Sequence, residues 1–217
     1  MNTLIQSFGA FSAIVFALTL LMNLGRKNSW LVVYYLLQSL VVTIGLISLS
    51  FSEGAEGLFY AALLTLTVKV ILAPAFLLHM IQKYRIYFSG RSYLNTPFTL
   101  FCLAAITAFS YSLIGPHVSE FGHSVGITLL FAAILCVLFQ MTNRSGTLSA
   151  IIGILSLENA VVLLTAQLGL EHSFALEFAI TFDIAVWIGI ATGFLTMIYR
   201  EFGTVDTAAR MTHLIEE

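Results

Sequence analysis

Long apolar runs dominate this chain, and they limit what it can fold into. A helix needs roughly 20 apolar residues to cross a bilayer core of about 30 Å. Only 9% of the 217 residues are charged and 59% are hydrophobic, whereas a soluble domain carries about 25% charged residues. The sequence therefore predicts an all-α, polytopic membrane protein, a bundle of seven transmembrane helices. The expected spans are residues 4–24, 29–50, 57–82, 96–114, 123–142, 147–169 and 173–199.

The placement of positive charge predicts how these spans are oriented. Of the nine Lys and Arg residues, eight follow the first, third, fifth and seventh runs, and the ninth, Lys69, lies inside the third. The connectors after the second, fourth and sixth runs contain Glu but no Lys or Arg. Because cytoplasmic connectors are enriched in Lys and Arg, we expect the N-terminus outside and the C-terminus in the cytoplasm. Residues 201–217 form the expected cytoplasmic tail.

Three ionisable residues lie near the middle of expected spans: Lys69, Glu158 and Asp183. A charge at the bilayer centre costs about 2.5–3.5 kcal/mol on insertion scales. Such residues are tolerated where they face a polar interior, pair with one another or move ions. The pattern indicates a charged internal axis, and these three residues are the candidates for a proton or ion pathway.

Glu158 and Asp183 lie at similar depths in neighbouring expected spans. Two carboxyl groups at one depth disfavour simultaneous ionisation, so they are able to share a proton. Ser156 and Asn159 flank Glu158 and can supply hydrogen bonds. The alternative is that each acid is neutral and only bonds one helix to another.

Lys69 lies five residues before Pro74. Proline has no N–H, so in a regular α-helix the carbonyl of Val70 lacks its usual donor. A free carbonyl beside a buried ammonium suggests a polar niche, in which Lys69 pairs with a carboxylate or takes part in ion movement. Proline is also common in membrane helices that have no such role.

Three further polar residues are weaker candidates for the pathway. Glu177 lies near the outer end of its span and is either an entrance group or interfacial. His79 lies near the inner end of the third span, where a proton exit and an ordinary interfacial histidine are both plausible. Gln38 lies mid-span and either extends the polar axis or bonds one helix to another.

The sequence contains no pattern typical of a catalytic, cofactor or metal centre. It has no phosphate-binding glycine loop, no HExxH and no nucleophile elbow, and we expect no nucleic acid among its partners. Cys102 and Cys136 lie singly in apolar runs, which favours small buried hydrophobes over metal or cluster ligands. We therefore expect no catalytic residues, no cofactor and no metal in this chain.

The C-terminal part resembles the K subunit of respiratory complex I and the C subunit of multisubunit Na⁺/H⁺ antiporters. In those proteins a loop arginine precedes a helix with a mid-membrane Glu in a Leu-Glu…Asn-Ala setting, and the next helix carries a second acid. The matching residues here are Arg144, Glu158 within Ser156–Ala160, and Asp183. Ser156 replaces the family's glycine, and Asp183 replaces a glutamate.

Over nearly its whole length the chain resembles hydrogenase-4 component E, a membrane subunit of group 4 [NiFe] hydrogenase complexes of the formate-hydrogenlyase type. The N-terminal helices and the segment from Lys69 to Pro74 contribute to this likeness. The expected organisation is an N-terminal four-helix extension (1–114), a three-helix unit resembling the K subunit (115–200) and the tail (201–217).

The resemblance implies a subunit without redox centres in the cytoplasmic (inner) membrane of a bacterium or archaeon. Its expected partners are antiporter-like membrane subunits, the membrane-anchor subunit and the hydrogenase arm. Glu158, Asp183 and Lys69 would belong to a chain of charged groups that couples electron transfer to translocation of H⁺ or Na⁺. The alternatives are a subunit of a related antiporter-type complex without hydrogenase, a stand-alone seven-helix transporter, and a structural spacer with static charges.

Overall fold

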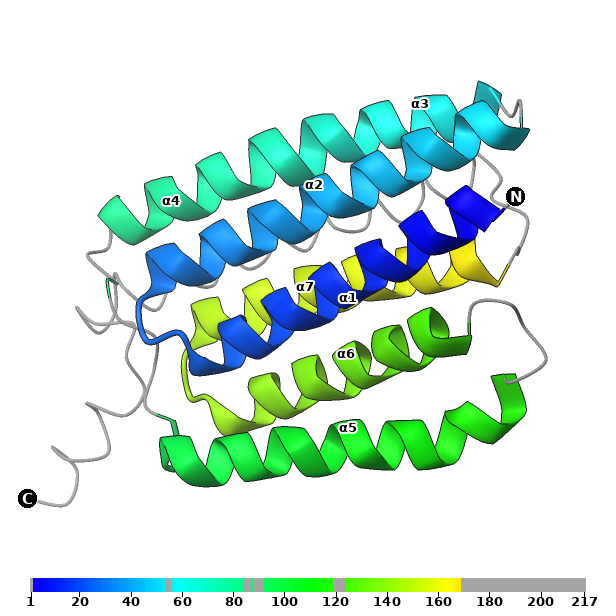
Figure 1. Cartoon of the computed structure of the whole chain (residues 1–217). Helices are drawn as coiled ribbons and strands as arrows, with labels where there is room; N and C mark the ends of the chain where they lie inside the picture. The colour runs from blue at the N-terminus through cyan, green and yellow to red at the C-terminus, as the bar shows by residue number, and fades with distance from the viewer. Residues whose placement is uncertain (1, 54–55, 84–86, 88–91, 119–123, 169–217) are drawn as a thin grey trace, which may run out of the picture.

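The computed structural model describes residues 2–53, 56–83, 87, 92–118 and 124–168, and all regular secondary structure in these ranges is helical (Figure 1). The third helical run is continuous but changes type, because a π-helix (η1) lies between its two α-helical parts. The elements are α1 (Asn2–Leu24), α2 (Asn28–Glu53), α3 (Glu56–Thr65), η1 (Leu66–Leu72), α4 (Ala73–Lys83), α5 (Thr96–Val118), α6 (Ser124–Asn143) and α7 (Thr147–Gln167).

The described helices make the chain a multi-pass membrane protein. Five stretches are long and apolar enough to cross a membrane, and α1 contributes a shorter apolar stretch over Gly9–Leu24. The seventh expected span (173–199) and the expected tail (201–217) lie outside the described residues. The five stretches are Asn28–Phe51, Ala62–Lys83, Thr96–Val118, Ser124–Asn143 and Thr147–Gln167.

The fourth span is longer than its sequence predicts. The sequence predicts a connector at Gly115–Pro116, but α5 continues through both residues to Val118. Proline fixes φ near −65°, a helical value, and removes one backbone donor. In the last turn this loss affects a single hydrogen bond, so the helix ends just after Pro116 and not before it.

The middle of the bundle is occupied by α1 and α7. α2 packs against both of them on one side, and α6 packs against both on the other. Figure 1 shows the α3–α4 run beyond α2 and α5 beyond α6, at opposite edges of the bundle. Helices from the two expected units therefore lie side by side, α1 against α6 and α2 against α7.

Buried apolar side chains form two clusters that occupy different halves of the helices. Along α1, α2 and α7, each cluster takes one half of the helix length. The first cluster, called cluster A here, includes Val15, Val42, Leu46, Ala62, Leu130, Ala160 and Leu163. The second, cluster B, includes Met22, Leu31, Tyr35, Ala73, Leu77, Ile152 and Leu155.

Aromatic side chains lie near both ends of α2. Trp30 contacts Tyr34 at the start of the helix, with ring centroids 6.0 Å apart. At the other end, the ring of Phe59 contacts both Phe51 and Tyr60, with centroids 6.3 Å apart in each pair. Aromatic rings of this kind are enriched at membrane–water interfaces. The two groups therefore indicate where the helix ends meet the two interfaces.

Gly126 permits a close approach of three helices. A Cβ atom on Gly126 of α6 would lie 2.9 Å from Oε1 of Gln167 on α7 and 3.2 Å from Oγ of Ser12 on α1. The Gln167 amide donates a hydrogen bond to Ser12 at this point. We expect Gly126→Ala to lower the free energy of unfolding by up to about 2 kcal/mol, because overpacking costs about 1–3 kcal/mol and the better helix propensity of Ala offsets up to about 1 kcal/mol of that cost.

Thermal unfolding in detergent checks this expectation, and Gly9→Ala is the matched control. A Cβ atom on Gly9 meets nothing within 4 Å, and Ala is about 1 kcal/mol more favourable than Gly inside a helix. Gly9→Ala should therefore leave the melting temperature unchanged or raise it. Equal melting temperatures for the two variants would contradict this account of Gly126.

Candidate functional site

A π-helical segment surrounds Lys69. In η1 the N–H of Ala73 donates to the carbonyl of Val68, five residues earlier. The prediction that Pro74 leaves Val70 without a donor assumes the α-helical register. In the observed register the carbonyl opposite Pro74 is that of Lys69 itself. The predicted niche is thus shifted by one residue, onto the backbone of the buried lysine, and π-helical segments occur frequently at functional sites.

Lys69 and Glu158 form an ion pair between η1 and α7. The distance from Lys69 Nζ to Glu158 Oε1 is 2.5 Å. The lysine side chain is 1% exposed and the glutamate side chain is 15% exposed. An isolated charge at this depth is very costly, and a counter-charge in direct contact offsets much of that cost. Each residue is therefore the partner that the other requires.

A layer of hydrogen-bonded polar side chains accompanies the pair. The hydroxyl of Ser156 on α7 donates to Oε1 of Gln38 on α2, at 2.6 Å. The Gln38 amide in turn donates to the Thr19 hydroxyl on α1, at 2.8 Å. One turn along α7, the Asn159 amide donates to the Ser39 hydroxyl, at 2.9 Å. We call these five residues and the ion pair the polar layer; its members are Thr19, Gln38, Ser39, Ser156 and Asn159, together with Lys69 and Glu158.

The polar layer separates the two apolar clusters. On α2, Gln38 and Ser39 lie between Tyr35 of cluster B and Val42 of cluster A. On α7, Ser156 to Asn159 lie between Leu155 of cluster B and Ala160 of cluster A. The same order holds on α1 and along the α3–α4 run. Four helical runs therefore place polar groups at one depth, with apolar packing above and below.

Arg144 anchors the α6–α7 connector to the end of α1. Its Nη2 donates to the carbonyls of Met22, at 3.0 Å, and Asn23, at 2.6 Å, in the last turn of α1. These carbonyls have no donor within the helix, and a positive charge is favourable at a helix C-terminus. Burial lowers the pKa of Arg144 to about 10, so it remains charged at neutral pH.

Asn23 connects this anchor to the polar layer. Its side-chain amide donates to the backbone carbonyl of Thr19, at 3.0 Å, and to that of Cys136 on α6, at 3.2 Å. Thr19 is the member of the polar layer that α1 contributes. A series of hydrogen bonds thus runs from the buried arginine, through α1, to mid-depth.

The structure brings together three of the six residues that the sequence singles out. Lys69 and Glu158 are paired, and Gln38 lies in the same polar layer. His79 is exposed on α4 and is not a member of the layer. Asp183 and Glu177 lie outside the described residues, so a proton shared between Glu158 and Asp183 remains a prediction.

Several members of the polar layer are not distinctive in the sequence. Thr19 and Ser39 are small hydroxyl residues within apolar runs, and such residues commonly bond to their own helix, as Thr19 also does to Val15. Proximity to Gln38 in the chain was the available signal for Ser39. For Thr19 the sequence contains no such signal, because its partner Gln38 lies on another helix.

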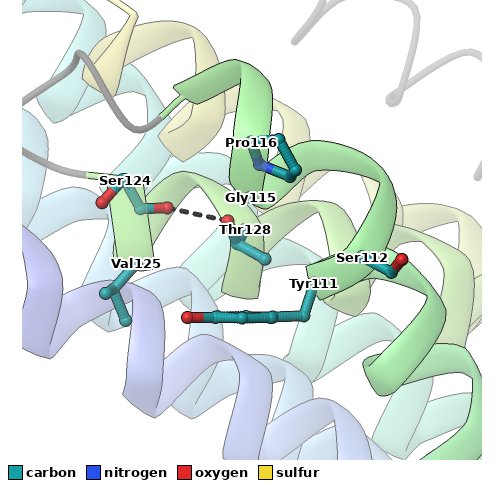
Figure 2. A pocket seen from close by; sticks show the side chains of 7 residues that line it. All are labelled: Tyr111, Ser112, Gly115, Pro116, Ser124, Val125 and Thr128. Carbon is teal, nitrogen blue, oxygen red and sulfur yellow. Dashed lines mark hydrogen bonds between the residues drawn. The ribbon is translucent and has the colours of Figure 1, made fainter.

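A cavity of about 400 Å³ lies between the end of α5 and the start of α6. In Figure 2 the ring of Tyr111 lies across it, and the hydroxyl of Thr128 donates to the backbone carbonyl of Ser124. Its lining has no charged residue and comes from α5 and α6, which contribute no side chain to the polar layer. The lining residues are Tyr111, Ser112, Gly115, Pro116, Ser124, Val125 and Thr128.

The chemistry available in the polar layer is that of a charged pair held among neutral hydrogen-bonding groups. Replacing a buried ion pair by apolar side chains is often neutral or stabilising, so stability alone is weak grounds for its presence. The pair does respond strongly to any nearby change of charge, because the surrounding dielectric constant is low. This arrangement is suited to sensing or moving charge within the membrane.

Comparison with family models, with curated proteins and with solved structures gives no match for this chain.

Proposed function

We propose that this chain is a non-redox membrane subunit of a membrane-bound [NiFe] hydrogenase complex of the formate-hydrogenlyase type. In this proposal the Lys69–Glu158 pair belongs to the axis that couples electron transfer to ion translocation. The sequence resemblance to hydrogenase-4 component E supplies the class of complex. The observation that carries the coupling role is the buried ion pair in the polar layer between two apolar clusters.

Coupling through this pair requires only a change of charge in a neighbouring group. When a neighbouring carboxylate gains or loses a proton, the electric field at the Lys69–Glu158 pair changes. The equilibrium between a pair in contact and a pair whose charges are separated changes with it. The hydrogen bonds from Gln38 and Asn159 to other helices fix the surroundings of the pair. The charge change is thereby passed on with little movement of the helices.

The alternative functions predict different partners or different sites for this chain. A related antiporter-type subunit would have the same buried pair but no hydrogenase partner. A stand-alone transporter would need a solute pocket at mid-depth, whereas the cavity in Figure 2 is lined by α5 and α6 and has no member of the polar layer. A structural spacer would contain the same Lys69–Glu158 pair, but its two charges would always stay in contact.

The proposed orientation is supported by where the described basic residues gather. Arg26 contacts Thr96 at the start of α5, and Arg144 forms an isolated β-bridge with Ser92. Both contacts lie at the end of the bundle where α1 stops and α7 starts (Figure 1). By the positive-inside rule this is the cytoplasmic end, with the N-terminus outside and seven spans in all.

Thiol labelling tests this orientation at the two ends of α5. Tyr93 and His117 are both exposed and flank the helix at opposite ends. In a background without Cys102 and Cys136, Tyr93→Cys should react with a membrane-impermeant reagent only from the cytoplasmic side. His117→Cys should react only from outside. The reverse pattern would overturn the orientation.

Affinity purification of the tagged chain from native membranes in mild detergent tests the proposed function. We expect hydrogenase subunits and antiporter-like membrane subunits to co-purify. Antiporter-like subunits without a hydrogenase would favour the related complex. Recovery of the folded chain alone would rule out the subunit role and leave the free-standing transporter.

A further inference from the structure

The connector between α1 and α2 carries two adjacent, exposed cations, Arg26 and Lys27. The Arg26 guanidinium donates from Nη2 to the Thr96 hydroxyl, at 3.4 Å, which uses one of its five N–H donors. Neither cation has an acidic partner within the part of the chain that the structure describes. Arg26 is thereby held at the start of α5, with Lys27 next to it in the chain. We call these two residues the connector cations.

The end of the bundle at which α1 stops carries positive charge without negative charge among the described residues. Lys83 at the end of α4 and the buried Arg144 lie at this end as well (Figure 1). The acids in the described ranges lie elsewhere: Glu53 and Glu56 at the opposite end, and Glu158 at mid-depth. An anion that reaches this end of the bundle therefore meets an attractive electric field.

Aromatic side chains indicate that the connector cations lie at the level of the lipid headgroups. The N–H of Asn28, directly after Lys27, donates to the carbonyl of Tyr87, at 3.1 Å. Tyr87 and Trp30 are both exposed, and Tyr and Trp are enriched where a membrane meets water. The phosphate groups of the bilayer lie at this level, within reach of long Arg and Lys side chains.

The face of α5 that continues from Thr96 into the membrane is exposed and apolar. Leu100 lies one turn after Thr96 and on the same face, since residues four apart in a helix lie one above the other. Leu100 and its neighbour Phe101 are exposed, and the Phe101 ring contacts that of Phe98, with centroids 6.2 Å apart. Among the five long spans α5 has the smallest share of buried residues, and it lies at the edge of the bundle (Figure 1). A cationic group is thus followed, deeper in the membrane, by an apolar face.

We infer that the connector cations and the start of α5 bind one anionic phospholipid. Its phosphate contacts Arg26 and Lys27, and an acyl chain lies along α5 from Leu100 to Phe101. Basic sites between membrane helices recognise acidic headgroups in this way. A free phosphate ion would use only the cations, and a zwitterionic lipid brings a positive group that the cations repel. The inference requires only that the chain lies in a membrane, so it is independent of the proposed hydrogenase role.

Native mass spectrometry of the full chain tests this site. The chain is released from detergent micelles that contain phosphatidylglycerol and phosphatidylcholine with the same acyl chains in equal amounts, and the bound lipids are counted. Each cation close to an anionic headgroup changes the affinity by about fivefold. We expect one phosphatidylglycerol to bind in preference to phosphatidylcholine, by up to about thirtyfold for the two cations together.

The charge variants separate this site from a general attraction to the positive end. Arg26→Gln/Lys27→Gln should bring the preference for phosphatidylglycerol close to one. Lys83→Gln is the matched control, because Lys83 is another exposed cation at the same end but belongs to the helical run at the opposite edge of the bundle from α5. It should leave the preference unchanged. These side chains are all exposed, so each variant should keep the helix content of the wild type, as circular dichroism measures it.

Leu100→Ala tests the apolar half of the site. It should lower the amount of retained phosphatidylglycerol severalfold, while the preference over phosphatidylcholine is kept. Phe109→Ala is the control, because Phe109 is exposed on α5 but lies about 20 Å along the helix from Thr96, beyond the half-thickness of about 15 Å of the bilayer core. Equal losses of lipid in these two variants would contradict a localised acyl-chain contact.

Equal occupancy by the two lipids in the wild type would overturn the inference and leave the connector cations to an acidic partner protein. A preference that Lys83→Gln lowers as much as Arg26→Gln/Lys27→Gln would overturn it as well, because the whole charged end would then be responsible. Prior incubation with inorganic phosphate, at the ionic strength of the control, should leave phosphatidylglycerol bound. Displacement of the lipid would mean that the site takes a free phosphate ion.

Discussion

Lys69→Met is expected to lower the free energy of unfolding by about 3–5 kcal/mol, the usual effect of removing one partner of a buried ion pair. The loss arises because Glu158 is left at mid-depth without its counter-charge, not because methionine packs badly. Glu158→Gln should cost a similar amount, since it strands the ammonium, which is 1% exposed. Lys83→Met is the matched control, because Lys83 belongs to the same helical run but is exposed.

The double variant Lys69→Met/Glu158→Gln should recover most of that stability. With both charges gone there is no buried ion to solvate, and neutral replacements of buried pairs are often tolerated. Chemical or thermal unfolding of the four proteins in detergent gives the coupling free energy between the two positions. Additive losses in the double variant would mean that the two residues do not depend on each other.

Arg144→Ala is expected to lower the free energy of unfolding by about 3 kcal/mol, because hydrogen bonds to charged groups contribute about 1.5–3 kcal/mol each. The arginine is 8% exposed, and it donates to two carbonyls at the end of α1. Without it those carbonyls lose their donor and the α6–α7 connector loses its attachment to α1.

Arg26→Ala is the control for Arg144. Arg26 is exposed and makes a hydrogen bond of 3.4 Å to Thr96, so its removal should change the free energy of unfolding by no more than about 0.5 kcal/mol. The rate of proteolysis in the α6–α7 connector, together with the melting temperature, distinguishes the two variants. Similar behaviour of both would contradict the anchoring role of Arg144.

The sequence predicts the helices well because the membrane imposes a length and a composition on each of them. The described helices agree with the first six expected ranges, apart from the extension of α5 through Gly115–Pro116 and the apolar stretch of α1, which covers only Gly9–Leu24. The depth of Lys69 and Glu158 is also readable, since depth follows from position within an apolar run. Charge in the connectors predicts an orientation by the same kind of rule.

The sequence does not predict the contact partners of Lys69 and Glu158 in the same way. Lys69 and Glu158 are far apart in the chain, and which helices touch depends on how the bundle packs. The neighbour that the sequence suggests for Glu158 is Asp183 on the next expected span, whereas its described partner is Lys69 on η1. The π-helical register around Lys69 likewise depends on packing, because Pro74 alone fits either register.

Ion translocation by the double variant Lys69→Met/Glu158→Gln is the most direct test of the central claim that the pair works in coupling. In inverted membrane vesicles that contain the intact complex, translocated ions are measured per electron transferred, for the wild type and for this variant. A coupling role predicts electron transfer with much reduced translocation in a complex that is still assembled. An unchanged ratio of ions to electrons would contradict that role and make the pair a static part of the bundle.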